Sequence, residues 1–392
     1  MKKQLSIFFI FFAICLTGAV LSSCTGSDKT EIQRERAVSK LLKKHRIKIA
    51  VAGPWSRKNN YLFEGLSLAC EEINSSGGVL GAQLELIPFD DNDNISTGEK
   101  VAYQICNDKE IGIVIGHTVS DLSVRNSLIY YYYGVLQFGP LSTNYKLTNS
   151  NLKTVFRNIP IDYELGASAA DFCAKRNWKR IIVYSQDTDY ADGLADAFEL
   201  QANYNRIFIT DHADFAVTSH VENYLDDIMF WQKNYDFDAI FIAGALPQTG
   251  EVISLIRESG IKQPIIGGDS FDDWMFFQSV KPDSLDEIYC VSNFNNDESL
   301  PSYSLFRKNF RARFGHDDDQ EAYQGYDAVK VIADAIVKTG SVKPSELARV
   351  MHSDIQWNEL AGPYSFDKEG DVAGRTIIIK KAGQGKFVKI TE

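Results

Sequence analysis

The residues most able to do chemistry in this sequence are short runs of acidic and amide side chains. Residues 90–94 read DDNDN, and oxygen-bearing side chains at this spacing are typical of a calcium-binding loop. The pattern is incomplete, because Ile95 stands where such a loop needs a glycine and Val101 where it needs a bidentate glutamate. We therefore expect residues 90–94, and the run DDD at 317–319, to form solvated loops, and we predict neither a metal site nor a cofactor.

Hydrolytic chemistry has equally weak support. Gly268, Asp269 and Ser270 form the GDS triplet of one class of serine esterases, but that class also needs an aspartate three residues before a histidine. None of the six histidines has one, and the chain contains no GxSxG, Walker-type or HExxH motif. The sequence does not predict an enzyme, and a secreted hydrolase remains only as an alternative.

The N-terminal segment points to export. Lys2 and Lys3 precede a nearly unbroken apolar run that ends in small residues and then Cys24, an arrangement typical of a secretory signal. A membrane-spanning anchor is the alternative, but crossing the hydrocarbon layer takes about 20 apolar residues and this run is only marginally long enough. The segment LSSC at 21–24 resembles the cleavage box of bacterial lipoproteins, which implies a signal peptide over residues 1–23 and lipid on Cys24.

The segment that follows, residues 24–46, is rich in charge and poor in glycine. Ile32, Val38 and Leu41 fall roughly on one side of a short helix, but we interpret the segment as a solvated, lipidated tether. Lipid contributes about 0.8 kcal/mol for each buried CH₂ group, so several acyl chains would hold the protein at a membrane surface.

Length and charge limit the rest of the chain. Residues 47–392 are too many for a single small core and suit two lobes. The net charge is −11, whereas a surface for nucleic acid needs clustered positive charge, so we expect no nucleic-acid partner.

The cysteines that remain after Cys24 are widely spaced, with neither a CxxC pair nor the spacing of a zinc site. Cys70 and Cys106 fall on consecutive expected helices, which right-handed crossovers place on opposite faces of a sheet. We therefore expect buried free thiols, including at Cys173 and Cys290.

Short β-branched runs alternate with apolar residues at helical spacing along the chain. We expect strands at Ile47–Ala52, Leu84–Phe89, Ile111–Gly116, Val135–Gly139, Arg180–Tyr184, Arg206–Thr210, Ala239–Ala243, Pro264–Gly267 and Ile288–Val291, and a terminal hairpin at Arg375–Lys380 and Lys386–Ile390. We expect Gly77-Gly78 to end the first helix and a capping box at Ser96–Glu99 to open the second.

Repeated strand–helix units imply parallel sheets that helices cover on both faces. Two such runs predict an α/β protein of two lobes. Because open α/β sheets bind ligands beyond the carboxyl ends of their strands, we expect a ligand in the cleft between the lobes.

Several blocks, taken in order, resemble the leucine/isoleucine/valine-binding protein family. They are EEINSSGGVLGAQLELIPFDDND, IGIVIGHTVSD, GVLQFGPLSTNYKLTN, VFRNIPIDYELG, RIIVYSQDTDYADGLADAF, IIGGDSF, AYQGYDAVKVIADAI and GPYSFDKEGD. The resemblance extends over essentially all of residues 47–392. This family comprises extracytoplasmic substrate-binding components of branched-chain amino-acid ABC transporters.

The resemblance implies the type I periplasmic binding protein fold, in which three crossings join two Rossmann-like lobes that close on a ligand. Mapped onto this chain, it places lobe one at residues 46–161 and 292–361, and lobe two at residues 162–291 and 362–392.

The resemblance also implies a ligand site. Ser120, in GHTVS, matches a serine that holds the ligand carboxylate together with loop amides, and Thr143 matches a threonine that contacts both carboxylate and ammonium. Leu141 matches a backbone-carbonyl contact. Asp269, in GGDSF, matches the acid that pairs with the ammonium, although an acid after an apolar strand is otherwise most often a turn or capping residue. Tyr190 matches an aromatic residue of the second lobe that lines the cleft.

The loop after the first strand departs from the family pattern. It reads GPWSRKNNY, which places Trp55, Arg57 and Lys58 near the expected side chain of the ligand. The stretch GALPQTG at 244–250 lacks a tyrosine that close relatives have. We therefore expect a retained amino-acid site with an altered side-chain pocket, in which Arg57 or Lys58 either meets an acidic or polar ligand tail or points to solvent.

Together these features predict a lipid-anchored solute-binding protein that takes an amino acid or a similar small ligand and delivers it to an ABC permease in the membrane. It would face the periplasm or the cell exterior. A ligand sensor of the same fold is the alternative among binding proteins. The bound amino acid, the membrane leaflet and the oligomeric state stay open.

Overall fold

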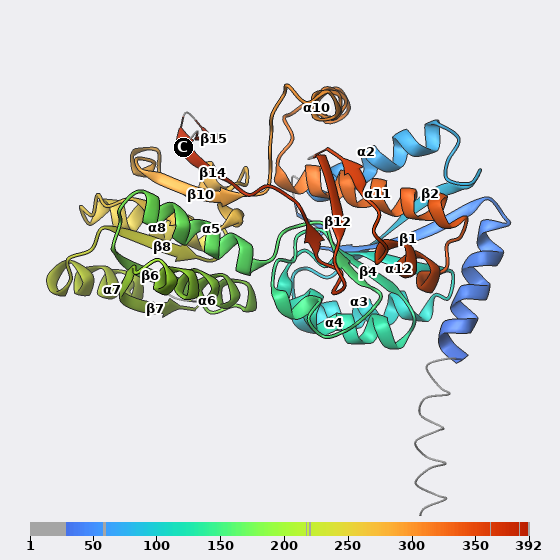
Figure 1. Ribbon diagram of the computed structural model, residues 1–392, viewed down its shortest axis with the longest axis horizontal. Coiled ribbons are helices and arrows are strands. Elements are labelled where there is room, and N and C mark those ends of the chain that lie inside the picture. Colours follow the sequence, from blue (N-terminus) through green and yellow to red (C-terminus); the bar gives the residue numbers. More distant parts are fainter. Residues whose placement is uncertain are drawn as a thin grey trace, which may run out of the picture.

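A computed structural model describes residues 29–57, 60–216, 218, 221–360, 362–383 and 385–390. The predicted signal peptide, the predicted lipid site Cys24 and the predicted site residue Lys58 lie outside the described residues. Figure 1 shows two lobes side by side, each built on a sheet with helices on both of its faces.

The first sheet is entirely parallel, with the strand order β2-β1-β3-β4-β5. Its chain segment contains β1 (Arg46–Gly53), α2 (Tyr61–Ser75), β2 (Gln83–Asp90), α3 (Ile95–Asn107), β3 (Ile111–Ile115), α4 (Ser120–Tyr132), β4 (Leu136–Gly139), the 3₁₀ turn η1 (Tyr145–Leu147) and β5 (Val155–Arg157). Every residue of β3, IGIVI, is buried, because helices cover both faces of the sheet.

The second lobe repeats this arrangement with the strand order β15-β14-β10-β9-β8-β6-β7. Its chain segment contains α5 (Asp162–Lys175), β6 (Arg180–Gln186), α6 (Asp189–Tyr204), β7 (Phe208–Phe215), α7 (Val221–Asn234), β8 (Ala239–Ala243), α8 (Gln248–Glu258), β9 (Ile265–Gly267), η2 (Asp269–Phe271), α9 (Phe276–Ser279), η3 (Pro282–Ser284) and β10 (Ile288–Ser292). Strands β6 to β10 pair in parallel, and the antiparallel edge comes from the end of the chain.

The last third of the chain returns to the first lobe and then crosses once more. It contains α10 (Pro301–Phe314), α11 (Gln320–Thr339), α12 (Pro344–Met351), β11 (Trp357–Glu359), β12 (Gly362–Phe366), β13 (Val372–Ala373), β14 (Ile378–Gly383) and β15 (Lys386–Lys389). The predicted terminal hairpin is confirmed as the antiparallel pair β14–β15.

The final crossing lies later than the resemblance placed it. Tyr364, Phe366 and Val372 pack in the hydrophobic core of the first lobe, although residues 362–392 were assigned to lobe two. The antiparallel pairing of β11, β12 and β13 explains the difference, because it carries the chain along the first lobe as far as Ala373.

Each face of the first sheet has its own core. Ile49 and Val51 of β1 pack with α2 and α11, whereas Ala50 and Ala52 of the same strand pack with α3 and α4. Cys70 belongs to the first of these cores and Cys106 to the second. The four cysteines within the described residues are free and buried, as predicted.

Helix boundaries follow local capping, with one correction. Gly77 and Gly78 follow α2 with φ angles of +103° and +76°, which confirms the predicted helix end. Helix α3 begins earlier than predicted, because the side chain of Asn94, rather than that of Ser96, caps it by accepting a hydrogen bond from the amide of Thr97 at 3.1 Å.

Residues 29–42 are helical and pack against the first lobe. Val38 and Leu41 are 5% and 2% exposed, and Arg34 is fully buried. Its guanidinium donates to the carbonyls of Asp108, Ile111 and others in the first lobe. The prediction of a solvated tether is therefore wrong for this part of the segment.

Candidate functional site

The loops at the carboxyl ends of both sheets face each other across the boundary between the lobes. In both sheets the first and third strands of the run lie side by side, β1 with β3 and β6 with β8. Loops diverge in opposite directions at such a point and leave a crevice. The predicted site residues Ser120, Thr143, Tyr190 and Asp269 all follow strands at these edges.

The first lobe contributes two hydroxyl groups. Ser120 is the first residue of α4, is 3% exposed, and accepts a hydrogen bond from the amide of Asn144 at 3.4 Å. Thr143 is fully buried, and its hydroxyl has no well-aligned hydrogen-bond partner within the described residues. Leu141 is half-buried beside them. The three residues predicted in this lobe therefore lie on two adjoining loops.

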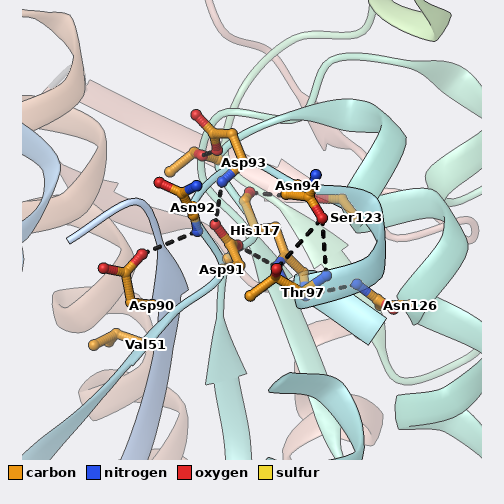
Figure 2. A network of polar contacts seen from close by, with 12 residues as sticks. Val51, Asp90, Asp91, Asn92, Asp93, Asn94, Thr97, His117, Ser123 and Asn126 are labelled. Carbon is orange, nitrogen blue, oxygen red and sulfur yellow. Dashed lines mark hydrogen bonds and ion pairs between the residues drawn. The ribbon is translucent and has the colours of Figure 1, made fainter. Parts of the chain in front are cut away.

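A buried polar network fixes the loop that leads to Ser120. Nδ1 of His117 lies 2.5 Å from the carboxylate of Asp91, and its Nε2 lies 3.0 Å from both the hydroxyl of Tyr130 and the amide of Asn126. Figure 2 shows how His117 reaches the loop after β2. Asp91 is fully buried, so the prediction of a solvated loop at residues 90–94 is wrong for this residue.

Arg157 fixes the neighbouring loop. It is fully buried and donates to the carbonyl of Ser142 at 2.8 Å and to the hydroxyl of Thr148 at 2.7 Å. Its Nε lies 2.7 Å from the carboxylate of Asp371, on the turn after β12. The position of Thr143 thus depends on a residue more than two hundred positions later in the chain.

The second lobe contributes Asp269 and Tyr190. Asp269 is 5% exposed and accepts a hydrogen bond at 2.8 Å from the hydroxyl of Tyr190. A side chain at residue 268 would clash with that hydroxyl, so Gly268 permits the contact. The other carboxylate oxygen of Asp269 lies 3.4 Å from the amide of Gln320 in the first lobe. Burial raises the pKa of Asp269, and the bond from Tyr190 partly offsets this rise.

Asp162 lies in the same site, although sequence reasoning did not select it. It opens α5 directly after the first crossing, and its amide donates to the carbonyl of Thr143 at 3.0 Å. The carboxyl is fully buried, and neither oxygen has a well-aligned hydrogen-bond partner among the described residues. Burial raises its pKa to about 8, and nearby Asp269 adds to the rise while the hydroxyl of Thr143 opposes it.

The residues predicted near the side chain of the ligand differ in the contacts they make. Nε1 of Trp55 donates to the carbonyl of Val51 at 2.9 Å, and its ring lies 5.2 Å from that of Phe63, so it packs against its own lobe. Arg57 lies 2.5 Å from the carboxylate of Asp93. Arg57 is therefore paired, although its side chain is 57% exposed to solvent.

The run 317–319 is also more buried than predicted. Asp318 accepts a hydrogen bond from Tyr303 at 2.8 Å, and its side chain is 1% exposed. Asp319 caps α11 by accepting from the amide of Ala322 at 2.9 Å. The solvated-loop prediction is wrong for these two residues.

One arrangement looks like hydrolytic machinery but lacks its geometry. The hydroxyl of Ser185 lies 3.0 Å from Nε2 of His212, whose Nδ1 lies 2.7 Å from Glu199. Ser185 is 1% exposed and already donates its hydrogen to Asp214. A nucleophile must reach a substrate and pass its proton to the base, so this group does not support hydrolysis.

Metal chemistry and membrane spans also lack support in the part of the chain that the structure describes. No three histidine, cysteine, aspartate or glutamate side chains gather there in a way that could hold a metal ion. Within the same residues, each helix is too short or too polar to cross a bilayer.

Two α/β lobes with buried polar groups between them define a two-lobed binding protein. Residues 48–386 match the family described as periplasmic binding protein, and the chain belongs to that family. The family comprises substrate-binding proteins of ABC transporters, which are not enzymes, so the predictions of family, fold class and lack of catalysis are confirmed.

Three relatives illustrate the similarity. The Leu/Ile/Val-binding protein of Escherichia coli (strain K12) is 23% identical over 329 residues, which cover 83% of this chain and 86% of that protein. An ABC transporter substrate-binding protein from Desulfitobacterium hafniense, solved in complex with Leu, is 31% identical, with a TM-score of 0.78 over 88% of this chain and 100% of that chain. A solute-binding protein from R. palustris, solved in complex with benzoate, shares the fold at 16% identity, with a TM-score of 0.78 over 88% of this chain and 95% of that chain.

Proposed function

We propose that this protein captures a small α-amino acid between its lobes and delivers it to an ABC permease. One observation carries the proposal: the two lobes direct buried polar groups without good partners toward one place. Thr143 and Gln320 come from the first lobe, and Asp162 comes from the second, where it lies near the hydrogen-bonded carboxylate of Asp269. Leaving such groups unpaired costs roughly 1–3 kcal/mol each, and a bound ligand would satisfy them.

The ligand carboxylate belongs on the first lobe in this proposal. Ser120 and Thr143 supply hydroxyl donors, and the N-terminus of α4 has no side-chain cap. Uncapped amides at a helix N-terminus attract an anion without the help of a cation.

The ligand ammonium belongs between Asp162 and Asp269. The pKa of each carboxyl is raised because burial disfavours its charged form. A cation between them would offset that cost, and hydrogen bonds to charged groups contribute roughly 1.5–3 kcal/mol each. This pair favours an amino acid over a ligand such as the benzoate of the R. palustris protein, which has no cation to offer.

Closure follows from the division of these groups between the lobes. The hydroxyl groups that would bind the carboxylate and the acids that would bind the ammonium meet only when the lobes are together. A ligand that contacts both halves therefore shifts the population toward the closed form. We also propose that lipid on Cys24 holds this receptor beside its permease.

The test is a thermal-shift screen of the full-length chain, purified in detergent, against the common amino acids and benzoate. A ligand at 100 times its dissociation constant adds roughly 2.7 kcal/mol to the free energy of unfolding. We expect at least one α-amino acid to stabilise the protein, and Asp269→Asn to weaken that ligand by at least about tenfold.

Asp236→Asn is the matched control, because Asp236 lies in the same lobe with a side chain that is 84% exposed. It should bind like the unmodified protein. A shift with benzoate and with no amino acid would contradict the proposal.

A further inference from the structure

Four carboxyl groups lie near one another at the boundary between the lobes, beside Arg57 of the loop that was expected near the side chain of the ligand. We call them the acidic cluster: Asp93 after β2, Asp273 after η2, and Asp319 and Glu321 at the junction with α11. Asp273 belongs to the second lobe and the other three to the first. The cluster lies beside the proposed site, because Gln320 of the same segment contacts Asp269.

These carboxyl groups are close enough to influence one another. Burial raises the pKa of Glu321 to about 8, and Asp273 and Asp93 add to the rise. Burial also raises the pKa of Asp273 to about 6 and that of Asp319 well above its ordinary value, to which Glu321 and Asp273 contribute. The carboxyl groups thus oppose one another's ionisation across the boundary between the lobes, and a cation placed among them would favour their charged forms.

Arg57 does not balance this charge. It lowers the pKa of Glu321 and of Asp273, but its guanidinium lies 2.5 Å from Asp93 and is committed to that carboxylate. Asp93 also accepts a hydrogen bond from Thr118 at 2.6 Å. The one arginine that acts on both Glu321 and Asp273 is therefore already paired with a third acid of the cluster.

Buried atoms beside the cluster lack partners. Oδ2 of Asp319 and Oε1 of Gln320 have no hydrogen-bond partner among the described residues, and each residue is only 7% exposed. The amide oxygen of Gln320 is an acceptor, and Oδ2 of Asp319 is one when that carboxyl is ionised, so a cationic donor would satisfy both atoms. Since no group of side chains in the described chain could hold a metal ion, an organic donor fits better than a metal.

An aromatic pair borders the same place. The rings of Tyr61 in α2 and Trp274 in the second lobe stack across the boundary at 5.7 Å. Trp274 directly follows Asp273 of the cluster in the chain. Burial raises the pKa of Tyr61 to about 12, and Asp319 and Asp273 add to the rise. Aromatic faces attract organic cations, so they complement the carboxyl groups.

We infer that the ligand carries a positive charge at its distal end, as an ammonium or guanidinium group on an amino-acid side chain. The inference rests on the proposed function. It favours a cationic ligand tail over the acidic or polar tail that was considered for Arg57 or Lys58. The α-amino acid end occupies the site of Asp162 and Asp269, and the distal cation faces Glu321, Asp273 and the free oxygen of Asp319.

Calorimetric titration of the full-length chain in detergent tests this. The probes are L-lysine, L-arginine, L-norleucine, L-glutamate and 1,5-diaminopentane. Norleucine matches lysine in length without its charge, so we expect lysine or arginine to bind at least about tenfold more tightly than norleucine. Glu321→Gln should remove most of this preference while it leaves the binding of norleucine within about twofold.

Asp334→Asn is the matched control, because Asp334 lies exposed on the same helix. It should keep the preference for the cationic ligand. If norleucine or glutamate binds more tightly than lysine and arginine, the inference fails while the amino-acid function stands. If the diamine binds and no amino acid does, the cationic end is supported and the proposed function fails.

Discussion

At the scale of single residues, the proposed site depends on carboxyl groups that folding places away from water. Asp162 carries the largest consequence, since its carboxyl is fully buried and its pKa is about 8. The folded, unliganded protein therefore holds a proton there at neutral pH that the unfolded chain does not. We expect Asp162 to lower the stability of the unliganded protein as pH rises from about 4 to about 8, because the folded state binds more protons over that range, and chemical denaturation across this range would measure the change.

Ligand binding should release this proton. An ammonium beside Asp162 favours the ionised carboxylate, so affinity should rise from pH 6 to pH 8 by up to about tenfold per pH unit for each proton released. Titrations of the ligand in two buffers with different ionisation enthalpies measure the release. Asp162→Asn should reduce it by up to one proton, and an unchanged release would contradict the role of Asp162.

At the scale of secondary-structure elements, the sequence predicts the strands but not the buried polar contacts between elements. Strands such as β3 and β8 are short apolar runs, and their length and β-branched residues predict them directly. The prediction of a solvated tether is wrong for residues 29–42 because it assumed that charged side chains face water, as they normally do. Arg34 departs from that rule, since it satisfies carbonyls from separate elements that sequence alone does not bring together.

The candidate site shows the same limit. Ser120, Thr143, Tyr190 and Asp269 were selected as candidates because motifs resemble a family. Asp162 also lies in one of the quoted blocks, but only burial and its unpartnered oxygens mark it as a site residue. These properties come from packing between lobes, which a single sequence does not reveal.

The helix over residues 29–42 gives a test at this scale. Arg34→Met should lower the free energy of unfolding by about 3 kcal/mol, because several buried carbonyls lose a charged donor. Chemical denaturation measures the change. Arg36→Met is the control, since Arg36 is exposed two residues away, and it should change stability by less than about 0.5 kcal/mol. Equal losses in both variants would refute the structural role of Arg34.

At the scale of the whole molecule, the lobes touch along both sides of the site. Asn144 and Lys146 of the first lobe reach Asp189 of the second, the lysine at 2.8 Å. On the other side Tyr61 stacks on Trp274. The structure therefore represents a closed arrangement, in which a ligand would be enclosed by contacts from both lobes.

The proposed lipid anchor is tested on the whole protein in cells. Cys24→Ser removes the sulfur that would carry lipid, so we expect the variant to leave the membrane fraction while it keeps its ligand affinity. Fractionation followed by immunoblotting measures this. Ser23→Ala is the control and should remain with the membrane. A Cys24→Ser variant that stays in the membrane fraction would count against lipidation at this position.

The burial of Arg34 also bears on which half of the protein can move. Within the described residues, Arg34 joins the helix at residues 29–42 to carbonyls of the first lobe, so the chain enters the protein through that lobe. If lipid on Cys24 anchors the chain to a membrane, the first lobe would keep its orientation to that membrane and the second lobe would move on closure. When a ligand binds and the lobes close, a permease would then meet a change in the position of the second lobe only.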